Sequence, residues 1–279
     1  MATESRRETL AMLRRQARII RQRVMTTLQA AGSGHVGGSL STVDILTCLY
    51  FHAMKVDPKN PRWADRDRFV LSKGHASAAL CPTLAEKGFF PRQLLDTFNK
   101  LDSPFSMHPD MLKIPGADMS TGSLGHGLSV ALGMALAARV QKKSFHTFVL
   151  LGDGELAEGS VWEAAMAAAH FKVDTLLAFV DRNRLQVDNF TNVIMGLEPI
   201  ADKWRAFGWA VREIDGHDVG AILDAIEAFP FESGKPSVVV ARTVKGKGLP
   251  FAENRIDFHY HDVDEVMAKE AVAILEKEA

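Results

Sequence analysis

The stretch "LLGDGELAEG" (residues 150–159) decides the fold of this chain. The apolar run 148–151 leads into it, and Asp153 then stands between two glycines. A short run that is apolar throughout is typical of a strand buried on both faces, as in a parallel sheet covered by helices. A carboxylate cannot pack in such a core, so we expect Asp153 at the carboxyl end of the strand, in the turn that opens the next helix. In a parallel sheet, ligands bind at that edge.

Strands and helices alternate on both sides of this stretch. The apolar runs separated by helical patterns favour a parallel sheet, because each strand needs a helical crossover to the next. We therefore predict an α/β fold, a three-layer parallel sheet flanked by helices on both faces. The predicted strands are 68–71, 146–151, 175–180, 210–214 and 237–242, and the predicted helices include 43–54, 159–171, 200–207 and 218–229.

Two further amphipathic helices are expected as extensions of a single domain that covers residues 1–279. The N-terminal one spans about 8–29, and the C-terminal one spans about 263–277. Asp262 is the expected N-cap of the latter, with Glu265 three residues on. Its predicted buried face consists of Val263, Val266, Met267, Ala271, Ile274 and Leu275.

Small residues recur every fourth position in the mostly apolar helical segment 121–140. A stripe of this kind permits close approach of another backbone. Tight packing on the sheet and a subunit interface explain it equally well. The stripe consists of Gly125, Ser129, Gly133 and Ala137.

Composition excludes several classes of function. The chain has 279 residues, of which 47% are hydrophobic, and its 33 basic side chains are balanced by 34 acidic ones. Such a balance gives no overall field that would attract nucleic acid or an anionic membrane. The longest apolar stretch, 128–138, is too short to span a bilayer. Cys48 and Cys81 fit two core thiols in a reducing compartment, so we expect a cytoplasmic protein.

Two glycine motifs do not predict a nucleotide site. The pattern G-x-G-x-x-G occurs at residues 32–37, but it follows a helix and not a strand. The run Lys245-Gly-Lys-Gly lacks the upstream glycine and the Ser or Thr of a phosphate-binding loop.

Asp153 and Asn183 together predict a metal site. Asn183 ends the next strand, so it should lie beside Asp153 after one β-α-β unit. The glycines and the helix start favour a phosphate, which a carboxylate repels unless a divalent cation lies between them. A carboxylate, an amide oxygen and the main-chain carbonyl of Leu185 are oxygen donors that Mg²⁺ or Ca²⁺ prefers. The alternative is an N-cap Asp and a turn Asn with no ligand.

The sequence G-D-G, followed after about thirty residues by Asn, resembles the thiamine diphosphate motif. From Gly32 to about His261 the chain is similar to the N-terminal portion of transketolases, specifically the smaller subunit of the split, two-gene form. Val36 and His126 stand where full-length transketolases usually carry Pro and Gln. The resemblance is carried by "GSGHVGGSLS" (32–41), "LSKGHAS" (71–77), "MHPD" (107–110), "STGSLGHGLS" (120–129), "GDGELAEGSVWEA" (152–164) and "DRNRLQVD" (181–188).

The resemblance implies roles for four histidines. His35 and His259 would serve proton transfer and hydrogen bonding around the reacting ketose carbonyl, His75 the cofactor and donor site, and His108 the donor hydroxyls. Neutral imidazoles suit proton transfer near neutral pH. His261 competes with His259 for one role, and register favours His259. A zinc site built from His259, His261 and a further histidine is the alternative.

The resemblance also implies cofactor contacts and ions. Gly122 and Leu124 would line thiamine diphosphate, and Gly154 would offer its backbone to the diphosphate. Glu158 matches the family's interface glutamate; a carboxylate stabilised by the helix dipole is the alternative, and the two roles are compatible. The implied metal is Mg²⁺, with Ca²⁺ or Mn²⁺ as alternatives.

The implied activity is transfer of a two-carbon ketol unit from a ketose phosphate to an aldose, as in the pentose phosphate pathway of carbohydrate metabolism. The family completes its site from a second α/β domain, for which no room remains after residue 188. We therefore expect a separate C-terminal subunit and a heterotetramer with the cofactor between unlike chains. The alternatives are a related enzyme such as a 1-deoxyxylulose phosphate synthase, a transketolase for a specialised sugar, and a noncatalytic binding homologue.

Overall fold

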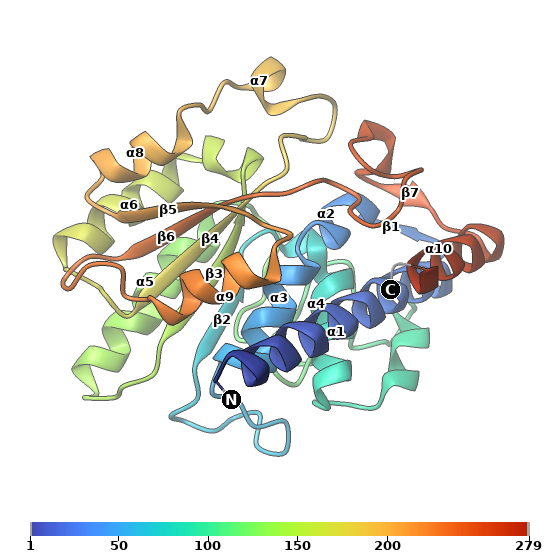
Figure 1. Ribbon diagram of the computed structural model, residues 1–279, viewed down its shortest axis with the longest axis horizontal. Coiled ribbons are helices and arrows are strands. Elements are labelled where there is room, and N and C mark those ends of the chain that lie inside the picture. Colours follow the sequence, from blue (N-terminus) through green and yellow to red (C-terminus); the bar gives the residue numbers. More distant parts are fainter. Residues whose placement is uncertain (1, 278–279) are drawn as a thin grey trace.

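Five parallel strands form the central sheet, and the stretch 150–159 begins within an inner strand. The computed structural model describes residues 2–277. All six residues of β3 are buried, because helices cover both faces of the sheet. The predicted α/β architecture is confirmed (Figure 1). The spatial order is β2 (Arg68–Leu71), β3 (Thr147–Gly152), β4 (Leu176–Arg182), β6 (Ser237–Arg242) and β5 (Ala210–Asp215).

Successive residues of each inner strand enter two different cores. Phe148 and Leu150 of β3 pack on one side, while Val149 and Leu151 pack on the other, as the two-residue period of a strand requires. The first core contains residues of α1 (Ala2–Ala31), α2 (Val36–Leu40), α3 (Val43–Cys48), α4 (Ser77–Lys87), α9 (Val219–Glu227) and α10 (Glu265–Lys277). The second contains residues of α5 (His126–Val140), α6 (Gly159–His170) and α8 (Ile200–Ala206).

The helix predicted over 43–54 ends earlier than expected. Its α-helical part is α3, and a π-helical turn, Leu49–Ala53, continues it. The short helix α7 (Thr191–Ile194) buries none of its residues.

The start of the C-terminal helix differs from the prediction. Asp262 pairs with Ser33 in a two-stranded sheet of β1 (Ser33–Gly34) and β7 (His261–Asp262), so the helix begins only afterwards. Asp264 is the N-cap, because its carboxylate accepts the backbone N–H of Met267 at 2.8 Å. Val266 is 74% exposed, so its place in the predicted buried face was wrong.

Three of the four residues of the small-residue stripe do not pack on the sheet, whereas the first, Gly125, is buried at the N-cap of α5. Ser129, Gly133 and Ala137 are exposed, whereas Leu128 and Ala131 are buried towards the second core. A Cβ added at Gly133 would meet nothing within 4 Å. Packing on the sheet was therefore the wrong explanation, and a subunit interface stays a prediction.

None of the helices within residues 2–277 is both long enough and apolar enough to cross a membrane. The single domain predicted for the whole chain also stays a prediction.

Candidate functional site

A cavity at the carboxyl ends of β3 and β4 collects most of the predicted site residues. The edge is the one at which parallel sheets bind ligands. Predicted residues that line the cavity are His75, Leu124, Asp153, Gly154, Asn183, Leu185 and His259. The sequence did not predict the other lining residues, Gly38, Lys73, Gly152, Glu155, Gln186, Val187 and Lys245.

Asp153 is held by the turn that follows β3. Its carboxylate accepts the backbone N–H of Gly154 at 2.8 Å and that of Arg184 at 2.5 Å. Burial and the nearby Asp181 carboxylate raise the pKa of Asp153 to about 6. Two adjacent buried carboxylates repel each other, and a divalent cation between Asp153 and a phosphate would relieve that repulsion. The residues present therefore fit a hard cation.

The other two expected metal ligands adjoin Asp153. The Asn183 amide donates to the Asp181 carboxylate at 2.9 Å, and its oxygen accepts the Leu185 N–H at 3.1 Å. The Leu185 carbonyl oxygen accepts from Lys245 Nζ at 3.0 Å, so it already faces a positive charge. The three residues that carry these oxygen donors therefore line one cavity, and their role as metal ligands stays a prediction.

Asp181 is fully buried, and its carboxylate joins several segments of the chain next to the cavity. Its carboxylate accepts from Lys73 Nζ at 2.5 Å and from the Ser41 hydroxyl at 2.7 Å, and the Thr243 hydroxyl also donates to it. Burial opposes ionisation, but the Lys73 charge and these hydrogen bonds prevail and lower the pKa of Asp181. Sequence reasoning missed this residue, although it lies two positions before Asn183.

Two buried lysines were also missed. Lys73 is 1% exposed and Lys245 is 2% exposed, and both line the cavity. Burial is the main reason why the pKa of Lys245 falls to about 8. Lys73 has the Asp181 carboxylate as its partner, whereas the hydrogen bonds of Lys245 go to neutral acceptors, so a diphosphate would add an anionic partner for Lys245. Two features of the sequence could have pointed to these lysines. Lys73 lies in the block "LSKGHAS", and Lys245 begins the run Lys-Gly-Lys-Gly, which is not a nucleotide-binding loop but does bring its lysine to the site.

Four predicted histidines from distant segments form one cluster. The ring centroid of His35 lies 5.1 Å from that of His75, 5.4 Å from that of His259 and 6.2 Å from that of His108. Burial is the largest cause that lowers the pKa of His35 to about 4 and that of His259 to about 3. Burial also lowers the pKa of His75 and of His108. The cluster therefore consists of neutral imidazoles at neutral pH.

The pairing of β1 with β7 distinguishes His259 from His261. His259 joins the cluster, whereas the His261 ring stacks on Phe258 with centroids 4.1 Å apart. Tyr260, which the sequence did not suggest, lies 5.0 Å from His35 between ring centroids. Within residues 2–277, no group of three or more His, Cys, Asp or Glu side chains could hold a metal ion, which counts against the zinc alternative.

The remaining predicted residues lie outside the cavity lining. Gly122 is exposed, and a Cβ placed there would lie 4.0 Å from the His108 ring. Glu158 is exposed at the N-cap of α6, where its side chain makes no capping hydrogen bond. Its interface role therefore stays a prediction.

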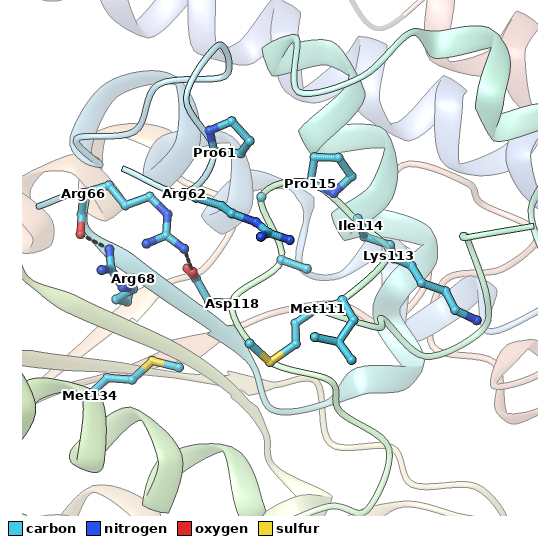
Figure 2. Close-up of a pocket in the computed structure, with 13 residues that line it drawn as sticks. Pro61, Arg62, Arg66, Arg68, Met111, Lys113, Ile114, Pro115, Asp118 and Met134 are labelled. Atoms are coloured by element: carbon cyan, nitrogen blue, oxygen red, sulfur yellow. Dashed lines mark hydrogen bonds and ion pairs between the residues drawn. The ribbon is translucent and has the colours of Figure 1, made fainter. Parts of the chain in front are cut away.

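A second hollow, lined by arginines, shares no residue with this cavity (Figure 2). Arg66 donates to the Asp118 carboxylate, and Arg68 donates to the Arg66 carbonyl, as Figure 2 shows. The charges of Asp118 and Asp67 act on Arg68 as well. Arg66 is thus paired with Asp118 within the chain, and we assign no function to this hollow.

Comparison with known proteins agrees with the site. Residues 13–274 match the family model described as "Transketolase, thiamine diphosphate binding domain". The chain is 48% identical to the 6-deoxy-6-sulfo-D-fructose transketolase subunit SqwG of Clostridium sp. (strain MSTE9), over 95% of this chain and 97% of that protein. It is 44% identical to an apulose-4-phosphate transketolase subunit of Phocaeicola vulgatus, over 86% of this chain and 85% of that one.

The same architecture forms part of a longer chain of known structure. The crystal structure of transketolase from Campylobacter jejuni superposes with a TM-score of 0.87 at 32% identity, over 94% of this chain and 43% of that chain. The present chain thus spans about two fifths of that transketolase. The cavity with its strand-end oxygens, the extent of the family match and these similarities agree, and the chain belongs to the transketolase thiamine diphosphate-binding domain family.

Proposed function

We propose that this chain is the smaller subunit of a split transketolase. Together with a separate C-terminal subunit, it transfers a two-carbon ketol unit from a ketose phosphate to an aldose, using thiamine diphosphate and Mg²⁺. The observation that carries the proposal is the meeting of Asp153, Asn183 and Leu185 with His75 and His259 around one cavity.

The chain's own residues fit the diphosphate end of the cofactor. Asp153, Asn183 and the Leu185 carbonyl would hold the metal ion, which would supply positive charge to offset the negative charge of the diphosphate. Lys73 and Lys245 would add positive charge from the floor of the cavity. When bound, the cofactor supplies an electron sink for cleavage beside a carbonyl.

The histidines fit the proton transfers of this reaction. We assign His35 and His259 to accepting and returning a proton near the ketose carbonyl, because a neutral imidazole can accept one and an imidazolium cannot. His75 and His108 would orient the cofactor and the donor hydroxyls. The burial that keeps all four neutral supports this assignment.

A partner chain would complete the site. Val187 lines the cavity and is exposed, and the neighbouring Phe190, Val193, Ile194 and Met195 are exposed as well. We call residues 187–195 the apolar rim. Such a group of exposed apolar side chains is typical of a protein interface. The names of the two relatives as subunits support a separate partner chain, and the assembly that we propose is a heterotetramer with two larger chains.

The cellular setting belongs to the same proposal. Cys48 and Cys81 are both buried and free, which suits a reducing cytoplasm. The names of the relatives also favour a second candidate, a transketolase for a specialised sugar outside the pentose phosphate pathway. The range of acceptors used by the assembled enzyme separates these two candidates.

Calorimetric titration of the co-expressed complex with thiamine diphosphate tests the proposal. We expect binding that requires Mg²⁺ and is lost in Asp153→Ala, while the far-UV circular dichroism is unchanged. Metal-independent binding, or a variant that binds as well as the wild type, would contradict the assigned metal site. A complex that binds the cofactor without ketol transfer would favour the noncatalytic homologue.

A further inference from the structure

We propose that His217 is a positioning residue for the cofactor site. It lies in the turn between β5 and α9 and holds the loop 244–249, and through that loop it places the Lys245 ammonium in the cavity. The effect on the cofactor rests on the function proposed above, whereas the effect on the loop does not.

The first link joins His217 to the loop. The backbone N–H of Val244 donates to His217 Nε2 at 2.8 Å. A backbone N–H can only donate, so Nε2 must be the unprotonated nitrogen and Nδ1 carries the hydrogen. The Nδ1 atom lies 2.8 Å from the Asp44 carboxylate, to which it therefore donates. One tautomer of His217 satisfies both contacts.

The second link anchors the histidine in the core. Two nitrogens of the Arg21 guanidinium donate to the two Asp44 oxygens at 3.0 and 2.5 Å. Asp44 is 4% exposed and Arg21 is 7% exposed. Burial opposes ionisation of Asp44, but Arg21 and His217 lower its pKa to about 2. A bidentate buried pair of this kind is geometrically fixed, so α1 and α3 together define where the imidazole lies.

The third link runs from the loop to the cavity. Lys245 follows Val244 directly, and its Nζ lies 3.0 Å from the Leu185 carbonyl oxygen and 2.7 Å from His259 Nδ1. Beyond the lysine, Gly246 has φ +83° and donates to the Gly37 carbonyl at 3.0 Å. A Cβ at Gly246 would lie 2.3 Å from the Ala252 carbonyl oxygen. The loop is therefore fixed after Lys245 by Gly246 and before it by His217.

His217 does not itself line the cavity. It borders another hollow, together with Asn183 and Val244. Its side-chain hydrogen bonds go to Asp44 and Val244 and not to a residue that lines the cavity, so we assign it a positioning role through the loop and not a catalytic one.

Two substitutions separate the two hydrogen bonds of the imidazole. In His217→Gln the side-chain oxygen can reach the place of Nε2 and accept from Val244, whereas the bond to Asp44 is lost. In His217→Asn the shorter amide can donate to Asp44 in the place of Nδ1 but cannot reach Val244. His52→Gln is the control, because His52 is an exposed histidine outside this network.

Two measurements on the co-expressed complex test the proposal. We expect the Val244 amide to exchange its hydrogen about tenfold faster in His217→Asn, and thiamine diphosphate with Mg²⁺ to bind roughly three- to tenfold more weakly, as expected for the loss of one hydrogen bond. His217→Gln keeps the bond to Val244 but loses the anchor to Asp44, so it should lie between His52→Gln and His217→Asn in both measurements.

The outcomes are separable. Unchanged Val244 exchange in His217→Asn, or equal cofactor affinity in the Asn and Gln variants, overturns the positioning role. A wild-type complex that binds no thiamine diphosphate overturns the proposed function instead, and the exchange measurement then still decides whether His217 holds the loop.

Discussion

Burial of imidazoles gives the metal-free chain a dependence on pH that can be measured. Burial, with the positive charges nearby, lowers the pKa of His35 from 6.5 to about 4. In the unfolded chain His35 takes up a proton near pH 6.5, but in the folded chain it does so only near 4. The unfolded state therefore binds more protons in this window, and stability present above pH 6.5 is lost as the pH falls.

We expect the free energy of unfolding of the isolated chain to decrease from about pH 6.5 towards pH 4. His35→Gln should reduce the steepness of this decrease, because the variant has one fewer group that gains a proton on unfolding. Urea unfolding of both proteins at several pH values measures it. Parallel pH profiles for the two proteins would show that His35 ionises normally in the folded chain.

Neutralisation of the two carboxylates at the strand ends should affect stability to very different extents. Asp153→Asn removes repulsion from Asp181 and keeps an acceptor for one backbone N–H, so its stability should remain within about 1 kcal/mol of the wild type. Asp181→Asn leaves the Lys73 charge buried without its partner, and we expect a loss of about 3–5 kcal/mol. Urea unfolding without metal compares the two, and equal losses would contradict the different roles assigned to them.

At the scale of the element, the pairing of β1 with β7 determines where α10 begins, and two substitutions test this. Asp264→Ala removes the acceptor of the Met267 N–H, and we expect a loss of about 0.5–2 kcal/mol. Asp262→Ala is the matched control, since Asp262 is exposed and pairs only through its backbone; a change within about 0.5 kcal/mol is expected. The reverse order in urea unfolding would restore Asp262 as the N-cap.

At the scale of the whole molecule, the cavity is bordered at Val187 by the exposed apolar rim, and we expect the chain to need a partner for activity. The isolated chain should show no ketol transfer, and mixing with the larger subunit should restore it. Val193→Asp in the apolar rim should weaken this restoration at low protein concentration without unfolding the chain, because Val193 is 62% exposed. Val266→Asp is the control, since Val266 is similarly accessible on α10, at 74%. Activity of the isolated chain, or equal effects of the two variants, would refute the shared site.

The sequence by itself determined the layered α/β fold, the strands and the oxygen donors at their ends. These features depend on short-range patterns: an apolar run of strand length, the turn glycines beside Asp153, and the spacing that returns Asn183 to the same edge. The four histidines came from resemblance, because no local pattern distinguishes them from the other histidines.

Only the tertiary structure decided which residues support these groups. Lys73 is buried against Asp181, and Lys245 against Leu185, from distant segments. The contact of His217 with Val244 joins the turn after β5 to the loop after β6. The exposure of Val266 and of the α5 stripe likewise depends on what packs against each helix. Burial, desolvation and long-range hydrogen bonds arise only when separated segments meet, so a pattern read along the chain cannot contain them.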